Sequence, residues 1–244
     1  MRILALDSSG LVASVAIVEE DNLLAEYTTN LKKTHSETLL PMIDALFSFT
    51  GTDLSEIDAI AVSCGPGSFT GLRIGSATAK GLGMARNIPL IPVPSLEGMA
   101  YHFTESSRLI CPMMDARRKQ VYSGIYCFEE GRFSVVSRET AGPVSELADK
   151  INALGREVIF LGDGVPAYRE TLESLVRVPH SYAPLHLNRQ RAAAVGARAF
   201  DLYREGRVET ASAHAPVYIR KSSAERELEA RGGQLTADNI RRAH

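Results

Sequence analysis

The order of predicted strands and helices is the feature that most constrains this fold, because both halves begin with the same order of three strands, a helix, a strand and a helix. Short apolar runs bounded by turn residues predict strands, and apolar residues repeating every three or four positions predict helices. In the first half, three strands are followed by a helix, a strand, a helix and a strand, at 3–7, 12–18, 23–29, 34–51, 57–62, 70–86 and 90–93. In the second half, three strands are followed by a helix, a strand and two helices, at 109–114, 121–128, 133–138, 145–154, 158–161, 166–175 and 189–205.

This order predicts an α/β protein with two lobes. Three antiparallel strands followed by alternating helices and strands form a mixed sheet with helices on both faces. The apolar pattern lapses near 100–107, so we expect an N-terminal lobe at 1–103 and a C-terminal lobe at 104–220. From Arg220 to His244 there are six basic and four acidic residues and no aromatic residue, so we expect 221–244 to be a mobile tail.

Composition limits the classes of function. The chain has 27 Lys and Arg against 29 Asp and Glu, which excludes general electrostatic capture of nucleic acid and leaves local basic patches open. Three unpaired cysteines favour a reducing compartment. The N-terminal apolar run stops at Asp7 and no run is long enough to span a membrane, so we expect a cytoplasmic protein without membrane association.

The segment CGPGSFTGLRIG at 64–75 is the strongest local motif, since six of the 19 glycines lie between Gly65 and Gly83. A glycine-rich turn before a helix can bind an anion, and Gly65 and Gly67 are weak candidates for such contacts. Gly164, which follows a predicted strand, is another. However, the segment matches neither the phosphate-binding P-loop nor the dinucleotide fingerprint. A tight turn that lets two backbones pack is therefore the favoured interpretation.

Small residues recur every four positions in the predicted helix at 70–86. They predict a close helix crossing, either in the core or between subunits. We predict that this face forms the subunit interface together with the helix that begins near Thr34, and that the same surface can make a homodimer when the partner is absent. The predicted interface residues are His35, Leu39, Met42, Gly71, Gly75 and Ala79.

Two further motifs have a structural and a functional interpretation. Asp7 ends the first strand, where a carboxylate could hold metal and phosphate or could bond the backbone of its own turn; the structural role is favoured. Arg117, Arg118 and Lys119 form either a solvated basic turn or a contact for RNA phosphate or an acidic partner. The histidines and cysteines form no zinc pattern, and no nucleophile elbow is present, so the chain itself is predicted not to be a catalyst.

Several segments, at 3–18, 32–43, 61–83, 91–100, 114–122, 160–165 and 215–220, together resemble the bacterial TsaB (YeaZ) family of tRNA threonylcarbamoyladenosine synthesis. The resemblance covers Met1 to about Arg220 and is most specific at 62–99. It implies an actin/sugar-kinase/Hsp70-like (RNase H-like) fold. It also implies that the chain is a non-catalytic paralogue of the catalytic subunit TsaD. Such a paralogue binds TsaD and acts with the ATPase TsaE. The complex modifies the adenosine at position 37 of tRNAs that read ANN codons. No cofactor of its own is implied, and ATP would act at the level of the complex.

One stretch departs from the catalytic paralogue. That protein carries a metal-binding His-x-Glu-Gly-His pair after the glycine-rich helix, whereas this chain has Ser95-Leu-Glu-Gly-Met99. A hydroxyl and a thioether cannot replace two imidazoles on a divalent ion, so we predict no tightly held metal. Two alternatives remain open. One is a small-molecule kinase or ATPase of the same superfamily, and the other is a glycoprotease-like metallopeptidase, against which the missing histidines argue.

Overall fold

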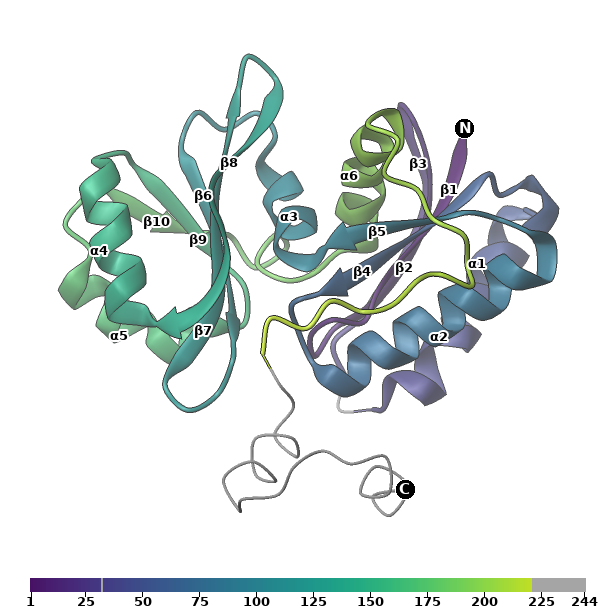
Figure 1. Ribbon diagram of the computed structural model, residues 1–244, viewed down its shortest axis with the longest axis horizontal. Helices are drawn as coiled ribbons and strands as arrows, with labels where there is room; N and C mark the ends of the chain where they lie inside the picture. Colours follow the sequence, from purple (N-terminus) through teal and green to yellow (C-terminus); the bar gives the residue numbers. More distant parts are fainter. Residues whose placement is uncertain (32, 221–244) are drawn as a thin grey trace.

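The computed structural model describes residues 1–31 and 33–220, which form two lobes, each built on a five-stranded sheet (Figure 1). The predicted tail at 221–244 lies outside the described residues. No helix in the described part of the chain is long and apolar enough to cross a membrane.

The first sheet has the strand order β3-β2-β1-β4-β5. Strands β1 and β2 and strands β2 and β3 pair antiparallel, whereas β1 with β4 and β4 with β5 pair parallel. The strands are β1 (Arg2–Asp7), β2 (Ala13–Glu19), β3 (Asn22–Thr29), β4 (Ala59–Gly65) and β5 (Leu90–Pro94).

The second sheet repeats this topology. Its strand order is β10-β9-β6-β7-β8, in which β6 is the central strand as β1 is in the first sheet. Strands β6 and β7 and strands β7 and β8 pair antiparallel, whereas β6 with β9 and β9 with β10 pair parallel. The strands are β6 (Leu109–Asp115), β7 (Gln120–Glu129), β8 (Arg132–Pro143), β9 (Val158–Leu161) and β10 (His180–Tyr182). The predicted fold class of two mixed sheets flanked by helices is confirmed.

Helices cover both faces of the first sheet. Successive side chains of a strand point to opposite faces, and in this sheet the side chains on both faces are apolar. In β1, Leu4 and Leu6 pack in the cluster under α1 and α2, whereas Ile3 and Ala5 pack under α6. Helices α4 and α5 cover one face of the second sheet, and α3 packs on its other face. The helices are α1 (His35–Thr50), α2 (Phe69–Arg86), α3 (Ser95–Ala100), α4 (Val144–Leu154), α5 (Gly164–Leu175) and α6 (Ala192–Arg204), with short 3-10 turns η1 (Leu54–Glu56) and η2 (Tyr101–Phe103).

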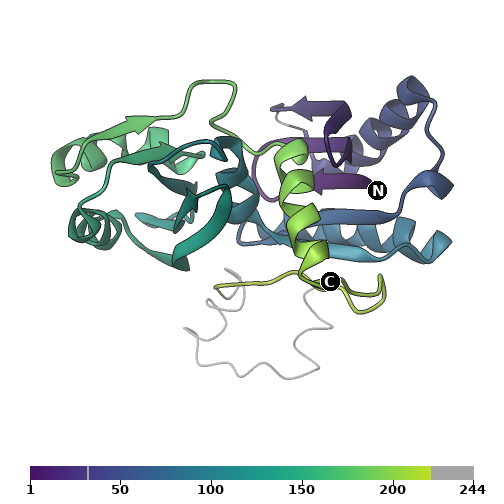
Figure 2. The ribbon, with the colours of Figure 1, turned by 90° about the horizontal axis from the view of Figure 1, so that it is seen from above.

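Helix α6 lies on the first lobe although the sequence places it after the second. Val195, Ala199 and Phe200 pack against Ile3, Val18 and other residues of the first sheet. Figure 2 shows α6 lying across the strands of that lobe. The range 104–220 that the sequence predicted for the C-terminal lobe therefore includes a helix that packs on the N-terminal one.

Helix ends follow local chemistry only in part. Helix α1 ends at Gly51 in the left-handed conformation, with φ of 66°, as predicted for a glycine after the last turn. At its start, Thr34 is the N-cap residue, but its side chain makes no capping bond to the helix backbone. Thr34 and Glu37 have the spacing that predicts a capping box, but no such box forms, because the Thr34 hydroxyl pairs with the Ser36 hydroxyl instead.

Candidate functional site

Asp7 is fully buried at the end of β1 and is bonded entirely by its own chain. Its Oδ1 accepts hydrogen bonds from the Ser9 backbone N–H at 2.8 Å and the Ser9 hydroxyl at 2.7 Å. Its Oδ2 accepts one from the Ser63 hydroxyl at 2.7 Å. Burial raises the pKa of the Asp7 carboxyl, which those hydrogen bonds oppose. Through these hydrogen bonds the buried Asp7 side chain shapes the β1–β2 turn.

The glycines of the 64–75 segment allow two backbones to touch. A Cβ at Gly71 would lie 2.0 Å from the Ser8 carbonyl oxygen, and one at Gly67 would lie 2.3 Å from the Ser9 carbonyl oxygen. A Cβ at Gly75 would lie 2.3 Å from Ser8 Oγ, which donates a hydrogen bond to the Gly71 carbonyl. These distances favour the packing interpretation of the segment over a phosphate-binding loop.

Five of the six predicted interface residues are buried within the fold, and His35 is partly exposed, so the five buried residues correct the predicted interface. Leu39, Met42 and Ala79 belong to the core between α1, α2 and the first sheet. Gly71 and Gly75 pack on the β1–β2 turn, as the distances above show. His35 Nε2 lies 2.9 Å from the Gly10 carbonyl oxygen of the same turn. The small-residue stripe is thus a crossing within the fold, because α2 must approach that turn closely.

The outward faces of α1 and α2 carry other apolar side chains. Leu40 and Phe49 of α1 are 56% and 81% exposed, and Met84 of α2 is 61% exposed. Ile74 and Leu82 of α2 are partly buried against the core. We call the three exposed residues, Leu40, Phe49 and Met84, the outer α1/α2 face. The sequence pattern of α1 and α2 did not indicate these residues, because it does not show which of two neighbouring apolar side chains, such as Leu39 and Leu40, faces the first sheet.

A C-terminal strap, defined here as residues 206–220, runs from α6 along α2 to the junction between the lobes (Figure 1). Its Val217 backbone N–H donates to the Cys64 carbonyl at 2.7 Å, and the Val217 carbonyl would lie 2.2 Å from a Cβ at Gly65. Farther along, Arg220 Nη1 donates to the Ala116 carbonyl in the second lobe at 3.2 Å. The strap therefore covers the start of the glycine-rich segment, where Gly65 has a φ of +129°.

Three polar side chains fix the strap to α2. His214 Nε2 lies 2.9 Å from the Ser76 hydroxyl, and His214 Nδ1 lies 2.5 Å from Glu209 Oε1. The order serine, histidine and acid matches that of hydrolytic triads, but Ser76 and His214 are only 4% and 1% exposed. A substrate cannot reach the hydroxyl, so the group anchors the strap. Ser76 is far in sequence from Glu209 and His214, so no local spacing could have indicated the group.

The remaining candidate residues do not converge on one site. Ser95 and Met99 are buried in α3, and the Ser95 hydroxyl has no hydrogen-bond partner among the described residues. Glu97, between them, accepts a hydrogen bond from Arg198 Nε at 2.8 Å. Gly164 begins α5 and packs against the Met113 carbonyl. Residues 1–31 and 33–220 contain no group of three or more His, Cys, Asp or Glu side chains able to hold a metal ion.

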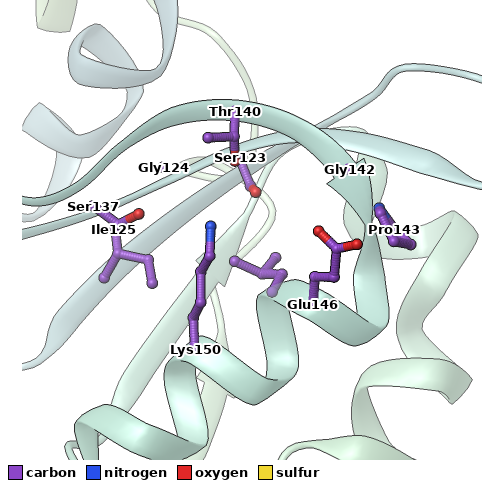
Figure 3. A pocket seen from close by; sticks show the side chains of 10 residues that line it. Ser123, Gly124, Ile125, Ser137, Thr140, Gly142, Pro143, Glu146 and Lys150 are labelled. Carbon is purple, nitrogen blue, oxygen red and sulfur yellow. The ribbon is translucent and has the colours of Figure 1, made fainter.

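A small hollow between β7, β8 and α4 is shown in Figure 3, with Glu146 and Lys150 of α4 at its mouth. Its volume is about 10 Å³, which is space for a single water molecule. Such a hollow cannot hold a substrate.

Glu139 of β8 lies where the two lobes meet. Burial, together with the nearby Glu97 carboxylate, raises the pKa of its carboxyl from 4.5 to about 8, although hydrogen bonds from the Leu96 backbone and the Tyr126 hydroxyl oppose the shift. The folded chain therefore holds a proton on Glu139 that the unfolded chain releases at lower pH.

A pH dependence of stability follows from this shift. The stability that the protonated Glu139 contributes is fully present below about pH 4.5 and is lost as the pH rises toward about 8. Glu139→Gln should remove that loss, so that the variant gains stability relative to the wild type between pH 5 and pH 9. Urea denaturation at both values measures this, with exposed Glu170→Gln as the control. The same pH dependence in the Glu139 variant and the wild type would contradict the assignment.

Three comparisons place the chain among known proteins. Residues 22–228 match the family described as TsaD, tRNA N6-adenosine threonylcarbamoyltransferase. The Bacillus subtilis tRNA threonylcarbamoyladenosine biosynthesis protein TsaB is 35% identical over 72% of this chain and 77% of its own length. The protein of the same name from Escherichia coli is 31% identical over 69% and 74%. The structure of YeaZ from Pseudomonas aeruginosa superposes with a TM-score of 0.76 at 28% identity, covering 89% of this chain and 99% of that one.

Proposed function

The chain belongs to the TsaB family of tRNA threonylcarbamoyladenosine biosynthesis proteins, and on this premise we propose that it is the non-catalytic subunit that binds and activates a TsaD-like catalytic subunit. One observation carries the proposal. At the positions where the catalytic paralogue holds metal, this chain has the buried Ser95 and Met99, and the glutamate between them is paired with Arg198. The scaffold is kept, and the groups that would do chemistry there are absent.

We also propose that this subunit has no cofactor or nucleotide site of its own. Asp7 is bonded by its own chain, and Gly65 is covered by the strap, so neither supports a nucleotide site within this subunit. ATP would then enter through a TsaE-like ATPase, and tRNA through the assembled complex.

The outer α1/α2 face is the surface that we propose for the catalytic partner. It is apolar and exposed, and it lies on two helices whose inner sides are fixed by the core. A stable interface buries on the order of 800 Å² on each partner. Without the catalytic subunit, a second copy of the chain can cover the same face through a two-fold axis.

Substitutions on this face test the proposal. Leu40→Glu and Met84→Glu should each weaken binding to the catalytic subunit about tenfold or more, which corresponds to about 1.4 kcal/mol or more, because each places a charge in an apolar contact. Isothermal titration with the purified catalytic subunit measures the affinity. Leu185→Glu, at a site 87% exposed in the second lobe, is the matched control and should bind as the wild type does. Wild-type affinity in both face variants would refute this surface.

A further inference from the structure

Five cationic side chains gather where the strap passes from the first lobe to the second. Arg73 on α2 donates through Nε to the Tyr218 hydroxyl of the strap at 3.3 Å. Two residues later, Arg220 donates to the Ala116 carbonyl, next to the β6–β7 turn. That turn contributes the other three cations, Arg117, Arg118 and Lys119. Contacts of the strap thus join the cations of α2 and of the turn into one surface.

None of these five cations forms an ion pair with another described residue. Other arginines of the chain, such as Arg2 and Arg191, are paired with carboxylates. The nearest acid in the turn is Asp115, and its carboxylate accepts a hydrogen bond from the Arg117 backbone and not from its side chain. Because the whole chain has a net charge of −2, this concentration of unneutralised positive charge is local.

The backbone of the turn is strained. Arg117, Arg118 and Lys119 have φ values of 60°, 54° and 60°, so three consecutive non-glycine residues lie in the left-handed region. Side chains with a Cβ disfavour that region, and three adjacent like charges repel one another. A bound polyanion would offset the repulsion.

An aromatic platform lies beside the cations. Tyr218 stacks on Phe69 with ring centroids 4.3 Å apart, and the Arg73 guanidinium lies 4.1 Å from the Phe69 centroid. Tyr218 is still 39% exposed. Exposed aromatic rings between cations are the arrangement on which single-stranded nucleic acid stacks its bases while its phosphates contact the charges.

We propose that this surface binds an RNA strand, with the cations on its phosphates and Tyr218 beneath a base. We call it the strap RNA surface, and it consists of Arg73, Arg117, Arg118, Lys119, Tyr218 and Arg220. The proposal rests on the proposed function, since the RNA would be the tRNA that the complex modifies. It adds that this subunit itself contacts the RNA.

The test uses the full chain assembled with the catalytic subunit and the ATPase, and a fluorescently labelled tRNA transcript. The triple variant Arg117→Asn, Arg118→Asn, Lys119→Asn removes the charges and keeps a residue that tolerates the left-handed region. Fluorescence anisotropy at about 0.1 M salt should show RNA affinity reduced on the order of 100-fold, and the salt dependence should lose a slope of about 2, because each phosphate contact contributes roughly 0.7.

A matched control removes the same charge elsewhere. Arg132→Asn, Arg138→Asn, Lys150→Asn changes three exposed cations of β8 and α4 and should leave RNA affinity within about threefold of the wild type. Tyr218→Ala should weaken RNA binding about 5- to 150-fold, and Tyr203→Ala, at an exposed tyrosine of α6, should not.

Two results would overturn the proposal. One is wild-type RNA affinity in the triple variant. The other is a triple variant that fails to assemble with its protein partners, which would assign the surface to an acidic protein segment. Neither result bears on the proposed function, which is tested separately by measuring tRNA modification with and without the wild-type chain. If modification does not require the chain, the proposed function is refuted.

Discussion

Gly71→Ala should destabilise the chain by about 3 kcal/mol or more, at or above the upper end of the usual cost of overpacking. The added Cβ would lie 2.0 Å from the Ser8 carbonyl oxygen, which is backbone and cannot rotate away. Helix α2 and the β1–β2 turn must then separate, and the hydrogen bond from the Ser8 hydroxyl to the Gly71 carbonyl is lost. Thermal and urea denaturation measure the change.

The same helix provides the control. Gly81 is exposed on α2, and a Cβ there meets nothing within 4 Å. Gly81→Ala should therefore stabilise the chain by about 0.5–1 kcal/mol, which is the helix preference of alanine over glycine. If Gly71→Ala is as stable as the wild type and loses only partner binding, the stripe belongs to an interface and not to the core.

Omitting this chain from a reconstituted reaction should lower tRNA modification on the order of 100-fold. Under the proposed function, the chain acts by shifting its catalytic partner from an inactive to an active state. Raising an active state from about 1% to nearly full occupancy changes the rate by about that factor. The measurement uses the catalytic subunit, the ATPase, tRNA and the threonylcarbamoyl donor, with and without the chain. Modification at full rate in its absence would refute the subunit role.

Asp7→Asn separates structure from chemistry in the same assay. Among the described residues, Ser9 and Ser63 donate the hydrogen bonds that the buried Asp7 carboxylate accepts. The substitution should therefore reduce stability and leave the modification rate within a few fold when the protein is folded. A loss of about 10³ in rate with an intact fold would show that the residue takes part in catalysis.

Local patterns in the sequence were sufficient for most of the elements and for their duplicated order, but they missed the short helix α3 and the short strand β10. Strand and helix periodicities are set by neighbouring residues, so runs such as 57–62 and 145–154 predict β4 and α4 to within two or three residues. Local patterns did not assign side chains to the surface or the core. In α2, Gly75 is buried and Met84 is exposed. Gly75 is buried because the β1–β2 turn packs against it, and that contact is not visible in the sequence.

The sequence by itself determined the strands and helices that make up the two mixed sheets and the glycine-rich turn at 64–75, because each of these elements depends on residue types within one short segment. Tertiary structure alone decided that α6 returns to the first lobe, that the strap covers Gly65 and that Arg73 lies on one surface with the β6–β7 turn. These arrangements join residues far apart in the chain. They form because apolar faces and buried polar groups must find partners across the whole fold, a requirement that no local spacing records.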